Sequence, residues 1–167
     1  MDLYKSDKIR KGCYPAYQYW LRKLQSPPPF CKIFNKIMYK ITSFLYHCEI
    51  SSRNIGPGLY IGHPYGITVN PNAVIGANCN IHKGVTIGQE NRGKRKGAPK
   101  IGNEVWIGVN ATIVGKITIG DDVLIAPNSY INCDVPSHSI VFGNPCVIRH
   151  KDNATEGYIN SKVSVQK

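Results

Sequence analysis

Isoleucine recurs every six residues along the second half of the chain. A small or apolar residue also recurs four positions after each of these isoleucines. A period of six matches neither the 3.6-residue repeat of a helix nor the two-residue alternation of a strand. It is typical of a parallel β-helix, in which each six-residue unit forms one side of a triangular coil and the isoleucines stack inside. The repeating isoleucines are Ile101, Ile107, Ile113, Ile119, Ile125 and Ile131.

The same register extends backwards through Val69, Ile75, Ile81 and Ile87, with two interruptions. The step from Ile61 to Val69 is eight residues, which predicts two inserted residues near 66–68. We expect this insertion to push the chain outward beside His63 and to widen a groove there, although a bulge tolerated only for packing is the alternative. The second interruption, "QENRGKRKGAPK" at 89–100, predicts a longer loop.

Two helical patterns precede the repeats. Residues 14–25 place Tyr17, Trp20, Leu21 and Leu24 on one face, and "SPPP" then ends that helix. Residues 30–47 predict a longer amphipathic helix with lysines on a second face. Its apolar face is expected to pack on the body of the protein or on a partner subunit. The alternative is contact with an anionic membrane surface.

These patterns divide the chain into a helical segment 1–48, a β-helix 49–150 with the loop 89–100, and a tail 151–167. We expect the helices to cap one end of the coil and the tail to pack along its outside. A β-helix leaves flat faces and open ends, so such coils associate side by side or need caps. A homotrimer is the arrangement that we predict.

Composition limits the possible partners. The 167 residues carry a net charge of +11 and are 42% hydrophobic, which suits one core and attracts polyanions such as acidic lipid or a phosphorylated cofactor. Nucleic acid is not expected, because no stretch reads as a basic helix, zinc finger or RNA-binding sheet. The six cysteines form no CxxC pair, and neither a signal peptide nor a membrane span is evident. We therefore expect a cytoplasmic protein, with peripheral membrane contact through residues 30–47 as the alternative.

Residues 49–149 resemble the hexapeptide-repeat acyltransferases. The resemblance rests on "IGPGLYIGH" at 55–63, "AVIGANCNIHKGVTIG" at 73–88, "APKIGNEVWIGVNATIVGKITIG" at 98–120 and "VPSHSIVFGNPCVI" at 135–148. Within the superfamily, the match is to the branch of serine acetyltransferase and the small capsule or exopolysaccharide O-acetyltransferases. It implies an all-β fold, a left-handed parallel β-helix with a short helical cap. It also implies a homotrimer that binds acetyl-CoA between adjacent subunits.

The resemblance also suggests catalytic residues. His63 matches the general base of serine acetyltransferase, and Glu49 falls near the acidic residue that holds it. The chemistry agrees, because acetyl transfer to an alcohol needs a base for the hydroxyl proton, and a carboxylate can orient the imidazole. A backbone N–H near Gly88 or Gln89 would stabilise the oxyanion, and His82 is a second imidazole that could contact the site. A zinc enzyme like the γ-carbonic anhydrases is disfavoured, since its histidine pattern is missing.

Cofactor contacts follow from the same resemblance. The pantetheine arm of CoA would pass Gly108, Val109, Ala126 and Pro127, and Arg149 and Lys151 are candidates for the nucleotide phosphates. The basic loop is either a solvated hairpin or a source of contacts to CoA phosphates or to an acidic acceptor. Its cations are Arg92, Lys94, Arg95 and Lys96.

Three positions bear on the acceptor. Serine acetyltransferase has charged residues for the amino acid where this chain has Gly62, Gly97 and Ala98. With no charged group there to bind a zwitterion, the sequence favours a saccharide hydroxyl as the acceptor. L-Serine is the alternative substrate, and a non-catalytic trimeric binding protein is the alternative function.

Overall fold

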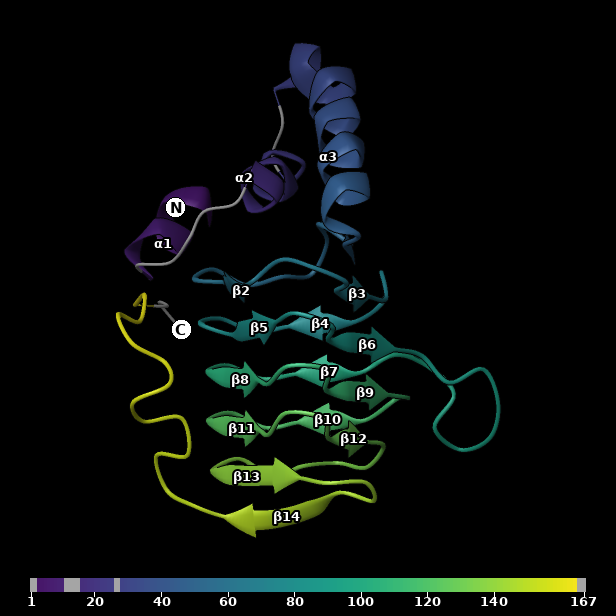
Figure 1. Cartoon of the computed structure of the whole chain (residues 1–167), viewed down its shortest axis with the longest axis vertical. Helices are drawn as coiled ribbons and strands as arrows, with labels where there is room; N and C mark the ends of the chain where they lie inside the picture. Colours follow the sequence, from purple (N-terminus) through teal and green to yellow (C-terminus); the bar gives the residue numbers. More distant parts are fainter. Residues whose placement is uncertain (1–2, 11–15, 26–27, 165–167) are drawn as a thin grey trace.

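The computed structural model describes residues 3–10, 16–25 and 28–164. From Glu49 onward the chain winds into a three-sided prism whose parallel strands stack into three sheets (Figure 1). A six-stranded sheet contains β2 (Tyr60–Gly62), β5 (Asn80–His82), β8 (Val105–Ile107), β11 (Val123–Ile125), β13 (Ser139–Phe142) and β14 (Val147–His150). A five-stranded sheet contains β1 (Glu49–Ile50), β3 (Thr68–Val69), β6 (Thr86–Gly88), β9 (Thr112–Val114) and β12 (Tyr130–Ile131). A three-stranded sheet contains β4 (Val74–Ile75), β7 (Lys100–Ile101) and β10 (Thr118–Ile119).

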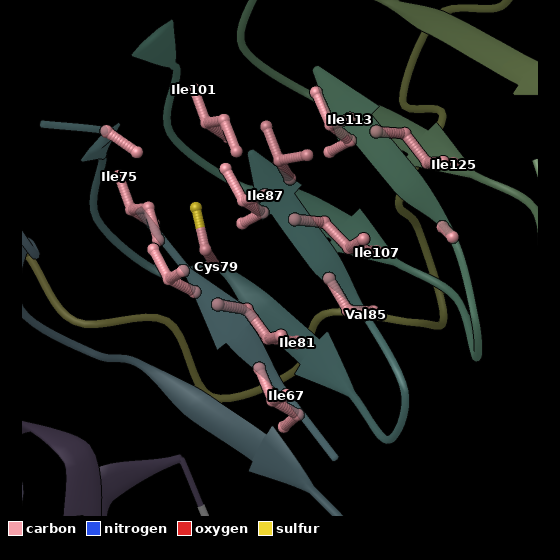
Figure 2. Close-up of a cluster of buried hydrophobic side chains, with 14 of the residues drawn as sticks. Ile67, Ile75, Cys79, Ile81, Val85, Ile87, Ile101, Ile107, Ile113 and Ile125 are labelled. Carbon is pink, nitrogen blue, oxygen red and sulfur yellow. The ribbon is translucent and has the colours of Figure 1, made fainter. Parts of the chain in front are cut away.

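The isoleucine repeat forms the core of this prism. Ile81 pairs with Ile107, and Ile107 with Ile125, on successive coils, so like side chains stack on one another. Figure 2 shows these side chains converging on the interior. All six isoleucines of the regular repeat are at least 97% buried. The predicted six-residue periodicity is therefore confirmed as the packing of a parallel β-helix.

Three helices lie at the β2 end of the prism (Figure 1). They are α1 (Leu3–Ile9), α2 (Ala16–Lys23) and α3 (Lys32–Tyr46), and a short 3₁₀ turn (Pro29–Cys31) leads into α3. The hydrophobic pattern does not predict α1. The helix predicted over 14–25 corresponds to α2, and its residues 14 and 15 lie outside the described part of the chain.

Buried polar contacts fasten the first two helices to the prism. Arg22 donates from Nε to Oδ2 of Asp7 at 2.7 Å and from Nη2 to Oδ1 at 3.0 Å. Asp7 also accepts the backbone N–H of Leu59 at 2.9 Å. Tyr17 and Leu21 of α2 are fully buried, as the predicted apolar face requires.

Helix α3 turns its polar face towards the rest of the chain and its apolar face outwards, which is the reverse of packing its apolar face on the body of the protein. Asn35 and Thr42 are buried on its inner face, whereas large apolar side chains such as Ile33 and Phe44 are exposed. The expectation that its apolar face packs on the body of the same chain is therefore wrong. None of the described helices has the length and apolar character needed to cross a bilayer.

The chain leaves the regular coil at three places. Five residues (63–67) join β2 to β3, whereas three (83–85) join the paired strands β5 and β6. The two inserted residues therefore belong to the segment that includes His63. The loop between β6 and β7 projects from the prism (Figure 1). Beyond β13, strand β14 returns antiparallel, and the tail then runs back along the outside towards the helices.

Candidate active site

His63 lies on a corner of the prism where the six-stranded sheet turns into the five-stranded sheet. We call the segments 63–67, 83–85, 108–111 and 126–129 on successive coils the His63 corner. His63 is exposed and adopts a left-handed backbone conformation, with φ of 56°. Gly66 donates its N–H to the carbonyl of Tyr46 at 3.2 Å, which ties this corner to the end of α3. The local structure thus directs an imidazole outward at a fixed point.

His82 packs directly beside this point. It pairs with Gly62 across β2 and β5, and its ring centroid lies 4.8 Å from that of Trp106. Its Nε2 is buried and has no hydrogen-bond partner in the described part of the chain. Burial lowers the pKa of His82, and repulsion from His63 lowers it further. His82 is therefore a neutral ring that supports the corner from the side.

Glu49 lies on the first strand of the five-stranded sheet, paired with Thr68. Its carboxylate is exposed and lines an open hollow of about 900 Å³ together with Phe44 and His47 of the α3 end. Both Glu49 and His63 are described, and no hydrogen bond joins their side chains. Catalytic hydrogen bonds are often unformed in a ligand-free enzyme. The role of Glu49 in orienting His63 therefore stays a prediction.

The expected pantetheine contacts share the His63 corner. Gly108 and Val109 follow β8, and Ala126 and Pro127 follow β11, so they lie one and two coils beyond the segment that follows His82. Arg149 is in β14 and Lys151 directly follows it, at the far end of the prism. Five strand spacings separate β2 from β14, on the order of 24 Å. Only an extended ligand could contact both ends of this track.

The basic loop occupies a different corner. Gly88 ends β6 and Gln89 begins the loop, at the edge of the five-stranded sheet away from His63. Within the loop, Arg95 forms an ion pair with Glu90, with Nη2 3.0 Å from Oε1. The hydrogen bonds that Arg95 donates to Glu90, and the negative charge of that carboxylate, raise the pKa of Arg95. The side chains of Arg92, Lys94 and Lys96 are exposed. A single copy therefore does not bring the loop to His63.

Sequence reasoning missed one cation on the His63 corner. Lys83 is exposed and follows His82, which is itself paired with Gly62. The strand register therefore places Lys83 beside His63, on the same track as Val109 and Pro127. Residues on neighbouring coils are usually eighteen positions apart, and this spacing could have identified Lys83. The two inserted residues lengthen the step from Gly62 to His82 to twenty, which hid the match. Among the described residues, no three histidine, cysteine or acidic side chains gather to hold a metal ion.

Comparison with known proteins identifies the family. A model described as "Bacterial transferase hexapeptide (six repeats)" matches residues 98–133, and one described as "Hexapeptide repeat of succinyl-transferase" matches residues 66–90. The serine acetyltransferase of Helicobacter pylori strain 26695 is 33% identical over 118 residues, which cover 70% of this chain and 69% of that protein. The chain belongs to the hexapeptide-repeat acetyltransferase family. Its fold is the left-handed parallel β-helix that was predicted.

Other members of the family are similar over a smaller share of their length. The serine acetyltransferase of Synechococcus elongatus is 30% identical over 142 residues, covering 80% of this chain and 56% of that protein. A solved serine acetyltransferase from Brucella abortus has a TM-score of 0.67 and 29% identity, covering 84% of this chain and 56% of its own. Soybean serine acetyltransferase complexed with serine has a TM-score of 0.65 and 28% identity, and the match covers 80% of this chain and 54% of the soybean chain. The chain thus spans a little over half of several of these relatives.

These members of the family overturn the expectation of a saccharide acceptor. The relatives and structures compared above are serine acetyltransferases, which supports the alternative substrate instead. The expected saccharide acceptor rested on three uncharged positions, and packing explains one of them. His82 fills the space beside Gly62, so the missing charge there reflects a neighbouring ring and does not identify another acceptor.

Proposed function

We propose that this protein is a serine O-acetyltransferase that transfers the acetyl group of acetyl-CoA to the hydroxyl of L-serine. The observation that carries this proposal is the similarity to the Helicobacter pylori serine acetyltransferase across 69% of that protein. A further solved relative, a Brucella abortus serine acetyltransferase in complex with coenzyme A, has a TM-score of 0.67 and supports CoA as the donor. A cytoplasmic location belongs to the same proposal, because the described cysteines carry free thiols.

His63 is the proposed general base. Its exposed imidazole would take the serine hydroxyl proton as the oxygen attacks the thioester carbonyl. The tetrahedral intermediate then expels the CoA thiolate, which takes up a proton as the thiol. Glu49 is proposed to orient the imidazole and to stabilise the imidazolium, after a rearrangement that joins the two side chains.

The complete site is proposed to form between copies in a homotrimer. His63 and the basic loop occupy different corners of one prism, so the loop of one copy would reach His63 of the next. In that arrangement a backbone N–H near Gly88 or Gln89 would stabilise the oxyanion in trans. Since Gly62, Gly97 and Ala98 carry no charge, the loop cations are the proposed partners of the serine carboxylate or of the CoA phosphates.

The division into 1–48, 49–150 and 151–167, the pantetheine track and the phosphate contacts of Arg149 and Lys151 stay predictions. The proposed activity is tested by incubating the full chain with acetyl-CoA and L-serine. Thiol release and O-acetylserine detected by mass spectrometry are the expected results. Glycerol and N-acetylglucosamine serve as alternative alcohols. Turnover with these alcohols but not with serine, by a protein that binds CoA, would reject the proposal.

A further inference from the structure

Helix α3 presents its apolar side chains to the outside of the molecule. Its inner face is formed around Asn35, Tyr39 and Thr42, and the Tyr39 ring lies 5.6 Å from that of Tyr17. On the opposite face Phe44 is 76% exposed, and Phe30, in the 3₁₀ turn that precedes α3, is 88% exposed. The other exposed apolar side chains of this region are Ile33, Phe34, Ile37, Ile41 and Leu45. Contiguous exposed apolar surface of this kind marks an interaction site.

The spacing of this face follows a heptad pattern. Within α3, steps of three, four and three residues separate its central members, and Phe30 in the preceding 3₁₀ turn lies four residues before the first of them. This alternation is the a/d pattern of helices that pack against like helices. The members, which we call the α3 seam, are Phe30, Phe34, Ile37, Ile41 and Phe44.

The flanks of the seam are unequal. Lys32, Lys36 and Lys40 lie on one side at heptad positions f, c and g, whereas the other side carries Met38 and Leu45. Lys32 and Lys36 therefore remain in water when the seam is covered. Lys40 at position g would face an apolar e position of the neighbouring helix, so like charges do not meet across the contact. Burying a side chain of this size stabilises a contact by about 1.5–3 kcal/mol, so five of them form a substantial interface.

We propose that the α3 seam packs against the same seam of other copies of this chain, forming a parallel three-stranded helical contact. Isoleucine at both a and d, as at Ile41 and Ile37, favours three or four strands over two. Figure 1 shows α3 standing along the direction in which the strands stack. Prisms that lie side by side with parallel axes would therefore bring their α3 helices together in parallel. That three copies take part rests on the homotrimer of the proposed function. That the seam packs against its own copy rests only on the exposed apolar face and its heptad spacing.

This contact also reaches the candidate active site. Phe44, the last member of the seam, lines the same hollow as Glu49. The end of α3 is tied to the His63 corner, because Gly66 donates its N–H to Tyr46. A second copy seated on the seam would cover the hollow beside Glu49. The seam thus couples assembly to the surroundings of the proposed dyad.

Photo-crosslinking tests which molecule covers the seam. The full chain carrying Ile37→p-benzoylphenylalanine is irradiated, and the matched control carries the same amino acid at Lys32, an exposed position off the seam. Covalent dimers and trimers from position 37, and only monomers from position 32, are expected. Irradiation products from position 37 that contain no second copy of the chain would overturn the proposal.

A second experiment separates self-association from membrane contact without using activity. The double variant Ile37→Gln, Ile41→Gln is compared with Lys32→Gln, Lys36→Gln by sedimentation velocity. We expect the isoleucine variant to associate at least tenfold more weakly than the lysine variant. Flotation of the wild-type chain with phosphatidylglycerol vesicles, together with equal self-association of both variants, would identify a lipid surface as the occupant and reject the seam contact.

Discussion

Gly62 lies against the imidazole of His82, so closely that a Cβ at position 62 would lie 2.5 Å from Nδ1 of His82. That separation is well inside ordinary van der Waals contact. The residue before the proposed base is therefore glycine because a neighbouring ring occupies the space of its side chain.

The first prediction concerns this contact. Gly62→Ala should destabilise the fold by about 1–3 kcal/mol, because the methyl group must displace the His82 ring. Chemical denaturation measures the change. Gly88→Ala is the matched control, since its Cβ would meet a Val114 methyl at 3.3 Å and a Thr86 methyl at 3.9 Å. The double variant Gly62→Ala, His82→Ala should recover part of the loss, and no recovery would refute the proposed clash.

Replacement of the proposed base is the second prediction. His63→Asn should lower kcat for acetyl transfer by about 10²–10⁴-fold, because the serine hydroxyl then has no base. Asparagine tolerates the left-handed backbone at this position, so the fold should remain intact. His138→Asn is the matched control, another exposed histidine with positive φ that lies outside the candidate active site. Equal rates for the two variants in a thiol-release assay would exclude His63 as the base.

The third prediction tests the proposed dyad. Glu49→Gln should lower kcat with little change in KM for serine, since the carboxylate acts through His63. The double variant Glu49→Gln, His63→Asn should be no slower than His63→Asn alone, because residues that act as a unit are not additive. Steady-state kinetics of the three proteins give the answer. Fully multiplicative losses would show that the two residues act independently.

The basic loop supplies the fourth prediction. Substituting Arg92, Lys94 and Lys96 by alanine should raise KM for acetyl-CoA or serine more than it lowers kcat, because these cations would contact bound substrate and not the reacting atoms. The effect should shrink as salt is added. Arg95→Ala is the comparison variant, because Arg95 is already paired with Glu90. Unchanged KM values for both substrates would leave the loop a solvated hairpin.

The fifth prediction is a pH dependence. The pKa of His82 is lowered in the folded state by burial, and secondarily by His63. The unfolded chain therefore binds this proton more readily, and stability should fall as the pH drops below the ordinary histidine value of about 6.5. His82→Phe should flatten this part of the curve, measured by urea denaturation between pH 5 and 8. An identical pH profile for variant and wild type would contradict the linkage.

The interior of the prism was predictable because stacking imposes a strict repeat on the sequence. Ile107 and Ile113 are buried for the same reason that they are six residues apart. The interruption before Val69 was also visible as a change in step. Its placement within 63–67 was not, since the isoleucine count does not say which residues of a longer corner are extra.

Surfaces were less predictable than the interior. The amphipathic pattern showed that α3 has an apolar face but not which way that face points. In the structure the opposite face, which carries Asn35, is the buried one. The contact of His82 with Gly62 depends on pairing across coils, which a single strand does not reveal. The acceptor was predicted wrongly for a related reason, because an absent charge was interpreted without knowledge of the ring that replaces it.

The tail ties distant coils of the prism together. Thr155 donates its backbone N–H to Asp122 at 3.0 Å, and the backbone N–H of Val163 reaches the Asn78 side chain at 2.9 Å. A solenoid ordinarily frays from its open end, one coil at a time. Here the last coil cannot unfold separately until the tail has lost its hydrogen bonds to the earlier coils. The two ends of the prism should therefore unfold cooperatively, in one transition, and not one coil after another.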